Sequence, residues 1–180
     1  MKRLFFLACL LGILTGPAQA DVVCPHNLFS CLLRHTDAFY LADHDRFYTV
    51  YNQAFARAMR CDNYDAVAEY LKMHSTHHDN AEIDESVQED TEALLLLKPK
   101  CFFEGVARLN QEQRDNLLSN YRLFSRPNHV MALLRKFMHA GKYQHIATAI
   151  YNANLESYQE YGKDADDAPM DDLYEQYKSH

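Results

Sequence analysis

Three histidines and an aspartate lie close together in the segment "MHSTHHDN". On a helix His74 and His78 would share one face, and His77 stands three residues after His74. Imidazoles spaced in this way bind zinc, copper or nickel, and Asp79 would add a carboxylate. The segment also fits a polar connection at a helix C-terminus, where histidine interacts favourably with the helix dipole. We favour the connection, because no H-E-x-x-H motif occurs.

Motifs of common enzymes are absent from the sequence. It contains no G-x-S-x-G, no phosphate-binding loop and no dinucleotide fingerprint. A helical cell-wall hydrolase would need two carboxylates across a cleft. The carboxylates available for that role are Glu69, Glu85, Glu89, Glu92 and Glu104. A partly buried glutamate is more often salt-bridged than catalytic, so we assign no catalytic residue and no cofactor.

Tyrosines recur at helical spacing near the end of the chain. Tyr151, Tyr158 and Tyr161 fall along one helical face, and Tyr174 and Tyr177 follow. Tyrosine is enriched at the energetic centres of protein interfaces, which makes these five residues candidate binding residues. The same stripe also fits packing of the last helices onto their neighbours, with hydroxyls reaching water.

The N-terminus has the pattern of a secretory signal peptide. Lys2 and Arg3 precede an apolar run over residues 4–14, and Ala18 and Ala20 satisfy the small-x-small rule for cleavage. A bilayer-spanning helix needs about 20 apolar residues, which is more than this run supplies. We therefore expect a periplasmic or secreted protein. The expected organisation is a signal peptide over 1–20, an all-α domain over 21–161 and an acidic tail over 162–180.

Four cysteines lie beyond the expected cleavage point: Cys24, Cys31, Cys61 and Cys101. An even number in an exported chain favours two disulfides. If Pro25 opens a helix, Cys24 and Cys31 stand roughly 10 Å apart along its axis. A disulfide requires Cα atoms within about 7 Å, so each is expected to pair with Cys61 or Cys101. We favour Cys31–Cys61 with Cys24–Cys101, and the crossed arrangement stays open.

Charge is unevenly distributed along the chain. The formal net charge is −7, and removal of the leader would make it −9, which argues against nucleic acid and anionic membrane as partners. Seven acidic residues fall in 79–97 and eight in 156–180, whereas seven lysines and arginines fall in 107–145. These clusters fit either solvated helix faces or a dipolar surface that steers a charged protein partner.

Apolar residues recur with helical spacing almost throughout the chain, and only five glycines and five prolines occur. Asp43 fits a helix cap, Pro127 a first helical turn and Gly141 a helix end. The segment 162–169 reads as a flexible acidic linker. The pattern predicts an all-α fold of seven to nine helices arranged as antiparallel hairpins. The expected helices cover roughly 26–41, 44–60, 63–75, 82–97, 99–109, 111–125, 127–140, 142–161 and 170–178.

A weak internal similarity links three segments. "MRCDNYDAVAEYL", which begins at Met59, and "MHAGKYQHIATAI", which begins at Met138, share a turn, a tyrosine and an alanine at equal offsets. "CFFEGVAR", which begins at Cys101, aligns between them and gives spacings near 40. This turn-tyrosine-alanine pattern resembles tetratricopeptide-type and Sel1-type repeats, although most of their consensus glycines and alanines are missing. The resemblance implies stacked helical hairpins.

These observations predict an exported, non-catalytic module that binds another protein with a basic or dipolar surface. The concrete form is a periplasmic inhibitor or immunity-type protein that docks on a toxic hydrolase, or an accessory factor of an envelope machine. Stacked hairpins provide a groove for such a partner without catalytic loops. The alternatives are a secreted effector that acts on host proteins, a histidine-rich metal-binding protein and a helical cell-wall hydrolase.

Overall fold

The computed structural model describes residues 29–76, 78–139 and 141–178, and all regular elements in these ranges are helical. The prediction of an all-α fold is therefore confirmed. The α-helices are α1 (Phe29–Arg34), α2 (Thr36–Ala42), α3 (His44–Arg60), α4 (Tyr64–Leu71), α5 (Ala81–Leu97), α6 (Pro99–Arg108), α7 (Gln111–Asn120), α8 (Pro127–Phe137), α9 (Gln144–Ser157) and α10 (Met170–Tyr177). A 3₁₀ turn, Gly141–Tyr143, precedes α9, and a π-helical turn, Tyr158–Gly162, follows it.

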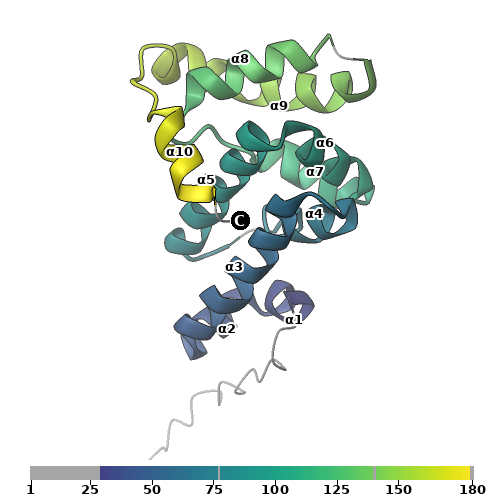
Figure 1. Cartoon of the computed structure of the whole chain (residues 1–180), viewed down its shortest axis with the longest axis vertical. Coiled ribbons are helices and arrows are strands. Elements are labelled where there is room, and N and C mark those ends of the chain that lie inside the picture. The colour runs from purple at the N-terminus through teal and green to yellow at the C-terminus, as the bar shows by residue number, and fades with distance from the viewer. Residues whose placement is uncertain (1–28, 77, 140, 179–180) are drawn as a thin grey trace, which may run out of the picture.

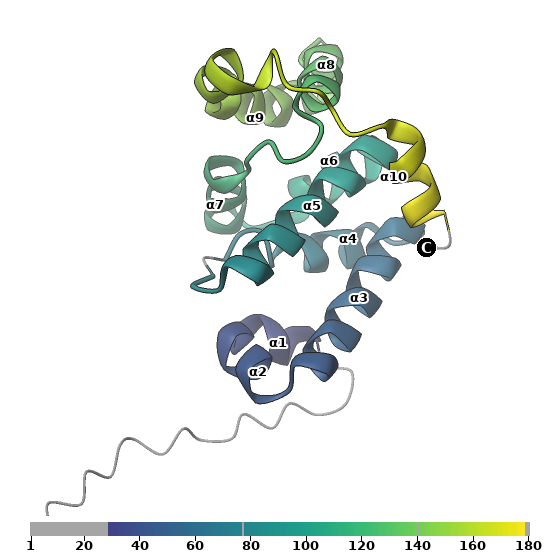
Figure 2. The ribbon, with the colours of Figure 1, turned by 90° about the vertical axis from the view of Figure 1, so that its left-hand side faces the viewer.

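The helices form an elongated stack (Figure 1). α1 and α2 cover one end of the long helix α3, and α4 to α7 form the middle of the molecule. α8 and α9 pair as a hairpin at the far end. α10 leaves this hairpin and runs along one side toward α5 and α3, which Figure 2 shows from a second direction.

Local signals in the sequence fix several helix ends. The Asp43 side chain accepts a hydrogen bond from the backbone N–H of Arg46 and so caps α3. Pro127 occupies the first turn of α8, where its missing N–H has no intrahelical partner to lose. Gly141 has a φ of 50°, the left-handed conformation that commonly follows a helix end.

One expected helix, 26–41, is interrupted in the part that the structure describes. His35 has a non-helical backbone and separates α1 from α2. The Thr36 hydroxyl donates to the carbonyl of Leu32 at 3.0 Å, and such local side-chain bonds compete with the helical ladder. No glycine or proline marks this break, so the sequence pattern did not reveal it.

Two other expected helices end early, at Leu71 and Asn120 instead of 75 and 125. After α7 the backbone N–H groups bond to side chains of other helices. Gln88 accepts from Arg122, Asn154 from Leu123, and Glu92 from both Phe124 and Ser125. These tertiary partners satisfy the backbone without a helix.

The closest helix contact joins α4 and α6. A Cβ atom added at Gly105 would lie 2.5 Å from Cγ1 of Val67 and 3.0 Å from Cδ1 of Leu71, so only glycine allows this approach. Cys61, which ends α3 in a left-handed conformation with φ 58°, forms a disulfide with Cys101 on α6. Their Cα atoms are 5.9 Å apart.

The expected pairing of Cys61 and Cys101 with the N-terminal cysteines is therefore wrong. That expectation rested on the separation of Cys24 and Cys31 along one helix. The packing of α6 against α4 instead brings Cys61 and Cys101 together. Cys31 is also disulfide-bonded, and Cys24 lies outside the described residues. Neither expected pairing occurs, because Cys61 and Cys101 bond to each other, and the one disulfide between described residues is a pair that the sequence reasoning did not favour.

The expectation of a flexible linker over 162–169 is also wrong. Asp167 accepts hydrogen bonds from the backbone N–H groups of Asn128 and His129 at 3.1 and 2.8 Å. The backbone N–H of Ala168 donates to the carbonyl of Ser125, and Leu173 on α10 is fully buried. Composition did not predict this packing, because it depends on one carboxylate. Asp167 accepts hydrogen bonds from backbone N–H groups in the first turn of α8.

None of the helices within the described ranges is long and apolar enough to cross a membrane. The expected signal peptide lies outside these ranges.

Candidate functional site

The connection after α4 buries most of the described side chains of the histidine segment, and Thr76 and Asp79 are exposed. α4 ends at Leu71, so His74 and His78 do not share a helical face. His74 is 3% exposed, and Ser75 and His78 are also buried. His77 lies outside the described residues, and Asp79 is exposed at the end of the segment.

His74 and His78 form part of the floor of a polar pocket of about 180 Å³, which we call the His74 pocket. Its floor is buried and its rim is exposed. The floor consists of His74, His78, Val87 and Gln88, and the rim of Thr76, Asp84, Asn120 and Arg122. Three stretches of chain therefore build one site: the connection after α4, the first half of α5 and the end of α7.

The two imidazoles of the floor differ in their bonding. His78 donates from Nε2 to the carbonyl of Met73 at 2.9 Å, and its buried Nδ1 lacks a partner among the described residues. Neither ring nitrogen of His74 makes a hydrogen bond of good geometry with a described residue, although the backbone of Val87 approaches the ring closely enough to oppose the lowering of its pKa. Burial, together with the nearby His78 and Arg122, lowers the pKa of His74 to about 3, so its ring is neutral at pH 7.

The metal interpretation gains no ligand set from the described residues. No three histidine, cysteine, aspartate or glutamate side chains in this part of the chain lie close enough together to hold a metal ion. The structure places His74 and His78 in one pocket and leaves Asp79 on the surface.

The predicted tyrosine stripe divides into bracing and exposed residues. Tyr151 accepts a hydrogen bond from Nε of Arg135 at 3.3 Å, and Tyr158 donates to Oδ1 of Asn128 at 2.7 Å. Both tyrosines therefore brace α9 and the π-helical turn against α8. Tyr177 is buried on α10 and donates to Oδ1 of Asp90 at 2.6 Å.

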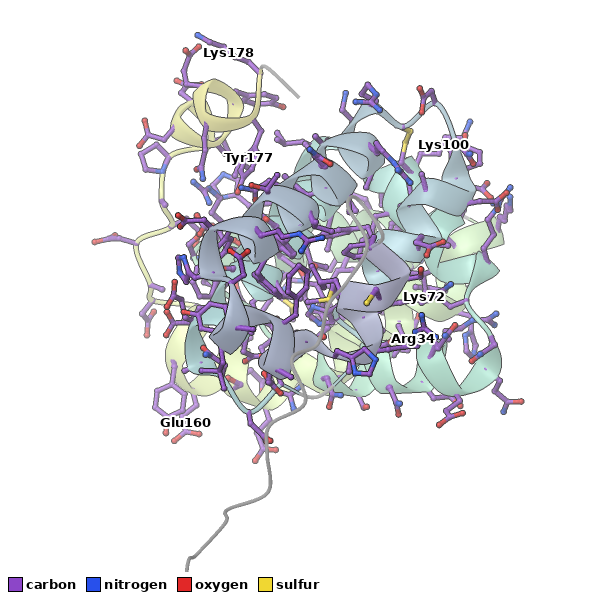
Figure 3. The ribbon with its side chains drawn as sticks, turned by 90° about the horizontal axis from the view of Figure 1, so that it is seen from below. Arg34, Lys72, Lys100, Glu160, Tyr177 and Lys178 are labelled. Atoms are coloured by element: carbon purple, nitrogen blue, oxygen red, sulfur yellow. A yellow bond between two sulfur atoms is a disulfide. The ribbon has the colours of Figure 1, made fainter. Side chains whose placement is uncertain are left out.

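Tyr161 and Tyr174 are 71% and 55% exposed. They lie on the C-terminal segment among exposed carboxylates, and we call this surface the acidic aromatic face. Its residues are Glu160, Tyr161, Asp164, Asp166, Asp171, Asp172, Tyr174 and Glu175. Figure 3 shows Glu160 near one end of the segment and Tyr177 near the other, on the flank opposite Lys72 and Lys100.

A hollow of about 250 Å³ adjoins this face where α10 meets the ends of α3 and α5. Met59, Leu97 and Tyr174 contribute to its wall. Lys98 and the ion pair of Glu175 with Lys178 also line it, so an apolar floor has a rim of both charges, as in an interface with a desolvated centre and a polar rim.

Basic residues gather at the opposite end of the α8–α9 hairpin. Arg135 and Lys136 end α8 and Lys142 precedes α9, whereas Glu156 and Glu160 lie where α9 ends. A helix is stabilised by acidic residues at its N-terminus and basic residues at its C-terminus. α9 is flanked by charges in the reverse order, and two of the basic residues have structural partners, Lys142 with Glu104 and Arg135 with the hydroxyl of Tyr151.

Two of the carboxylates considered for catalysis, Glu92 and Glu104, form structural hydrogen bonds. Glu104 is bound by Lys142, Tyr143 and Arg108, and these contacts lower its pKa to about 2. Burial raises the pKa of Glu92, although this carboxylate accepts three hydrogen bonds from Phe124 and Ser125. The two carboxylates are bonded to separate partners, Glu92 to the connection after α7 and Glu104 to α6 and the turn before α9.

No sequence signal pointed to several residues of the His74 pocket. Gln88 is an ordinary polar residue of α5, Asn120 ends α7, and Arg122 follows it in a connection more than 40 residues after the histidines. Gln88 of α5 joins them, because it bonds to the carbonyl of Asn120 and to the N–H of Arg122, the latter at 3.3 Å.

Comparisons with known proteins give no relative for this arrangement. No protein-family model matches the chain, and neither a curated protein nor a solved structure is significantly similar to it.

Proposed function

We propose that this chain is an exported, non-catalytic module whose acidic aromatic face binds a basic protein. In its most concrete form it is a periplasmic inhibitor or immunity-type protein that blocks a toxic hydrolase. An accessory factor of an envelope machine would use the same surface. The signal-peptide pattern of residues 1–20 supports export.

The observation that carries the proposal is the group of exposed carboxylates that surrounds Tyr161 and Tyr174 on the C-terminal segment, at a distance along the chain from the basic end of α8. A surface with separated positive and negative ends orients a charged partner during approach and raises the association rate.

The acidic aromatic face also has the rigidity that an interface requires. Asp167 fixes the segment to α8, and Tyr177 fixes α10 to α5 through Asp90. Tyr174 is thereby presented beside the apolar hollow without a large loss of conformational entropy on binding. Exposed tyrosine beside a desolvated hollow is typical of interface hot spots.

The proposal includes a repeat-like origin for the stack. The aligned aromatic residues Phe103 and Tyr143 lie against each other, with ring centroids 5.2 Å apart, and Tyr64 packs under the guanidinium of Arg108. These contacts support equivalent roles for the three segments. Assignment to tetratricopeptide-type or Sel1-type stacking is part of the proposal.

Site-specific photo-crosslinking in the producing cell tests this function. A photoreactive phenylalanine analogue at position 174 should capture one basic protein, and the same analogue at Asn116 on α7 should not. Both positions are exposed. Identical adducts at the two positions, an acidic captured protein, or no adduct at 174 would contradict the proposal.

Charge reversal sharpens this test. Asp171→Lys with Asp172→Lys should abolish the adduct at 174, because both carboxylates belong to the acidic aromatic face. Glu112→Lys with Asp115→Lys makes the same charge change on exposed residues of α7 and should leave the adduct in place. Equal losses in the two variants would attribute binding to net charge alone.

A further inference from the structure

We propose that the His74 pocket binds a small zwitterion, specifically a free α-amino acid with a small side chain. This site is separate from the acidic aromatic face and does not depend on the function proposed for it.

The first argument is the unmet hydrogen bonding of His74. A buried polar group without a partner destabilises a fold by about 1–3 kcal/mol, and native proteins rarely leave such groups unsatisfied. His74 has two such nitrogens, and His78 has a third, all within one pocket. A ligand or water with both donors and acceptors would satisfy them.

The second argument concerns the charges on the rim, which distinguish a ligand from water. Asp84 and Arg122 line the same pocket, yet they form no ion pair with each other. The Arg122 guanidinium uses Nη1 to donate to the carbonyls of Ser119 and Tyr121. Its remaining N–H groups are available for a carboxylate, and Asp84 is available for an ammonium group. An α-amino acid carries both groups on one carbon.

The third argument concerns the bonding roles on the floor. His78 must donate from Nε2, because its partner is the Met73 carbonyl. In the neutral ring Nδ1 is therefore an acceptor, which suits an ammonium proton. The neutral ring of His74 has one donor and one acceptor, and neither makes a hydrogen bond of good geometry, with the Val87 backbone as the nearest protein group.

The pocket also limits the size of the ligand. A water molecule takes about 30 Å³ of liquid, so a volume of about 180 Å³ corresponds to about six non-hydrogen atoms. Glycine and alanine fit this limit, and serine exceeds it by one atom. Gln88 holds the floor in place, because its side chain is already bonded to the backbone of Asn120 and Arg122.

Titration of the whole mature protein tests the proposal. The probes are glycine, L-alanine, D-alanine and L-serine, with acetate and methylammonium as ligands that carry only one of the two charges. Calorimetry measures affinity, and ¹⁵N NMR of the imidazole rings reports contact with His74 and His78. At least one amino acid should shift both ring signals and bind about tenfold or more tightly than acetate or methylammonium, because each lost charged hydrogen bond is worth about 1.5–3 kcal/mol.

Variants on the exposed rim give a second readout without disturbing the core. Arg122→Gln and Asp84→Asn should each weaken amino-acid binding about tenfold or more. Glu85→Gln and Arg57→Gln remove the same charges from exposed positions outside the pocket and should leave affinity unchanged. The proposal is overturned if no probe shifts the ring signals at about 10 mM, if acetate binds as tightly as the amino acids, or if Asp84→Asn has no effect.

Discussion

The α4–α6 contact and the attachment of the C-terminal segment hold their helices by different means. Between α4 and α6 the backbones approach so closely that Val67 and Leu71 lie directly over Gly105, and the Cys61–Cys101 disulfide closes one end. The C-terminal segment is held by a few separate contacts: Asp167 is bonded to the start of α8, Tyr177 is bonded to α5, and Leu173 is buried.

Substitutions should therefore have different effects on stability in the two regions. Close-packed apolar contacts tolerate almost no added volume. Hydrogen bonds that one carboxylate accepts contribute less to the free energy of unfolding, and they are lost when that single side chain is removed. We therefore expect substitutions to unfold the whole chain in the first region and to release only one segment in the second.

Removal of the disulfide should have the largest effect. Cys61 and Cys101 are separated by 40 residues, and a loop of that length corresponds to about 4 kcal/mol in the chain-entropy account. Cys61→Ser with Cys101→Ser should lower the free energy of unfolding by about that amount in denaturant titrations. Reductant added to the unsubstituted protein should lower it at least as much. An unfolding curve that is unchanged by the two substitutions would contradict this role.

A methyl group added in each region gives a matched comparison of packing. Gly105→Ala should destabilise the protein by about 2–3 kcal/mol, because Val67 and Leu71 leave no room for the new Cβ. Gly162→Ala should cost less, about 1–2 kcal/mol, because its closest contact, 2.8 Å to Cδ2 of Tyr158, is longer than the 2.5 Å contact at Gly105 and is relieved by weakening the bond from Tyr158 to Asn128. Equal changes in the two denaturation midpoints would remove the distinction between the regions.

Loss of the Asp167 carboxylate should have the smallest effect on global stability. Asp167→Ala removes the acceptor for two N–H groups at the start of α8 and should cost about 1 kcal/mol. Hydrogen exchange in 162–178 should accelerate while exchange in α4 and α6 stays slow. Asp166→Ala is the control, because this neighbour is exposed. Faster exchange throughout the chain would show that the segment is part of the cooperative core.

Much of the fold followed from local rules. The caps at Asp43 and Pro127 fixed helix starts, because each depends on residues within one turn. The disulfide partner of Cys61 did not follow, since it depends on how closely α6 approaches α4. The packing of 162–169 did not follow either, because its acidic composition hid the capping role of Asp167.

The sequence predicted that His74 and His78 belong to one candidate site, but it did not predict which residues surround them. The sequence singled out His74 and His78, but their burial results from the packing of α5 and α7 around the end of α4. The tyrosine spacing placed Tyr151 and Tyr158 on one face, and hydrogen bonds to α8 then use that face internally. Periodicity identifies a face, whereas only tertiary contacts show whether a neighbour covers it.

The bond between Cys61 and Cys101 makes residues 61–101 a covalent ring that contains the connection between α4 and α5. Thr76 and Asp79 are exposed in that connection, so a protease can reach the backbone there. A single cut would leave two polypeptides still joined through sulphur, with α4 and α6 in register. Such a nicked molecule should migrate as one species until a reducing agent separates its fragments.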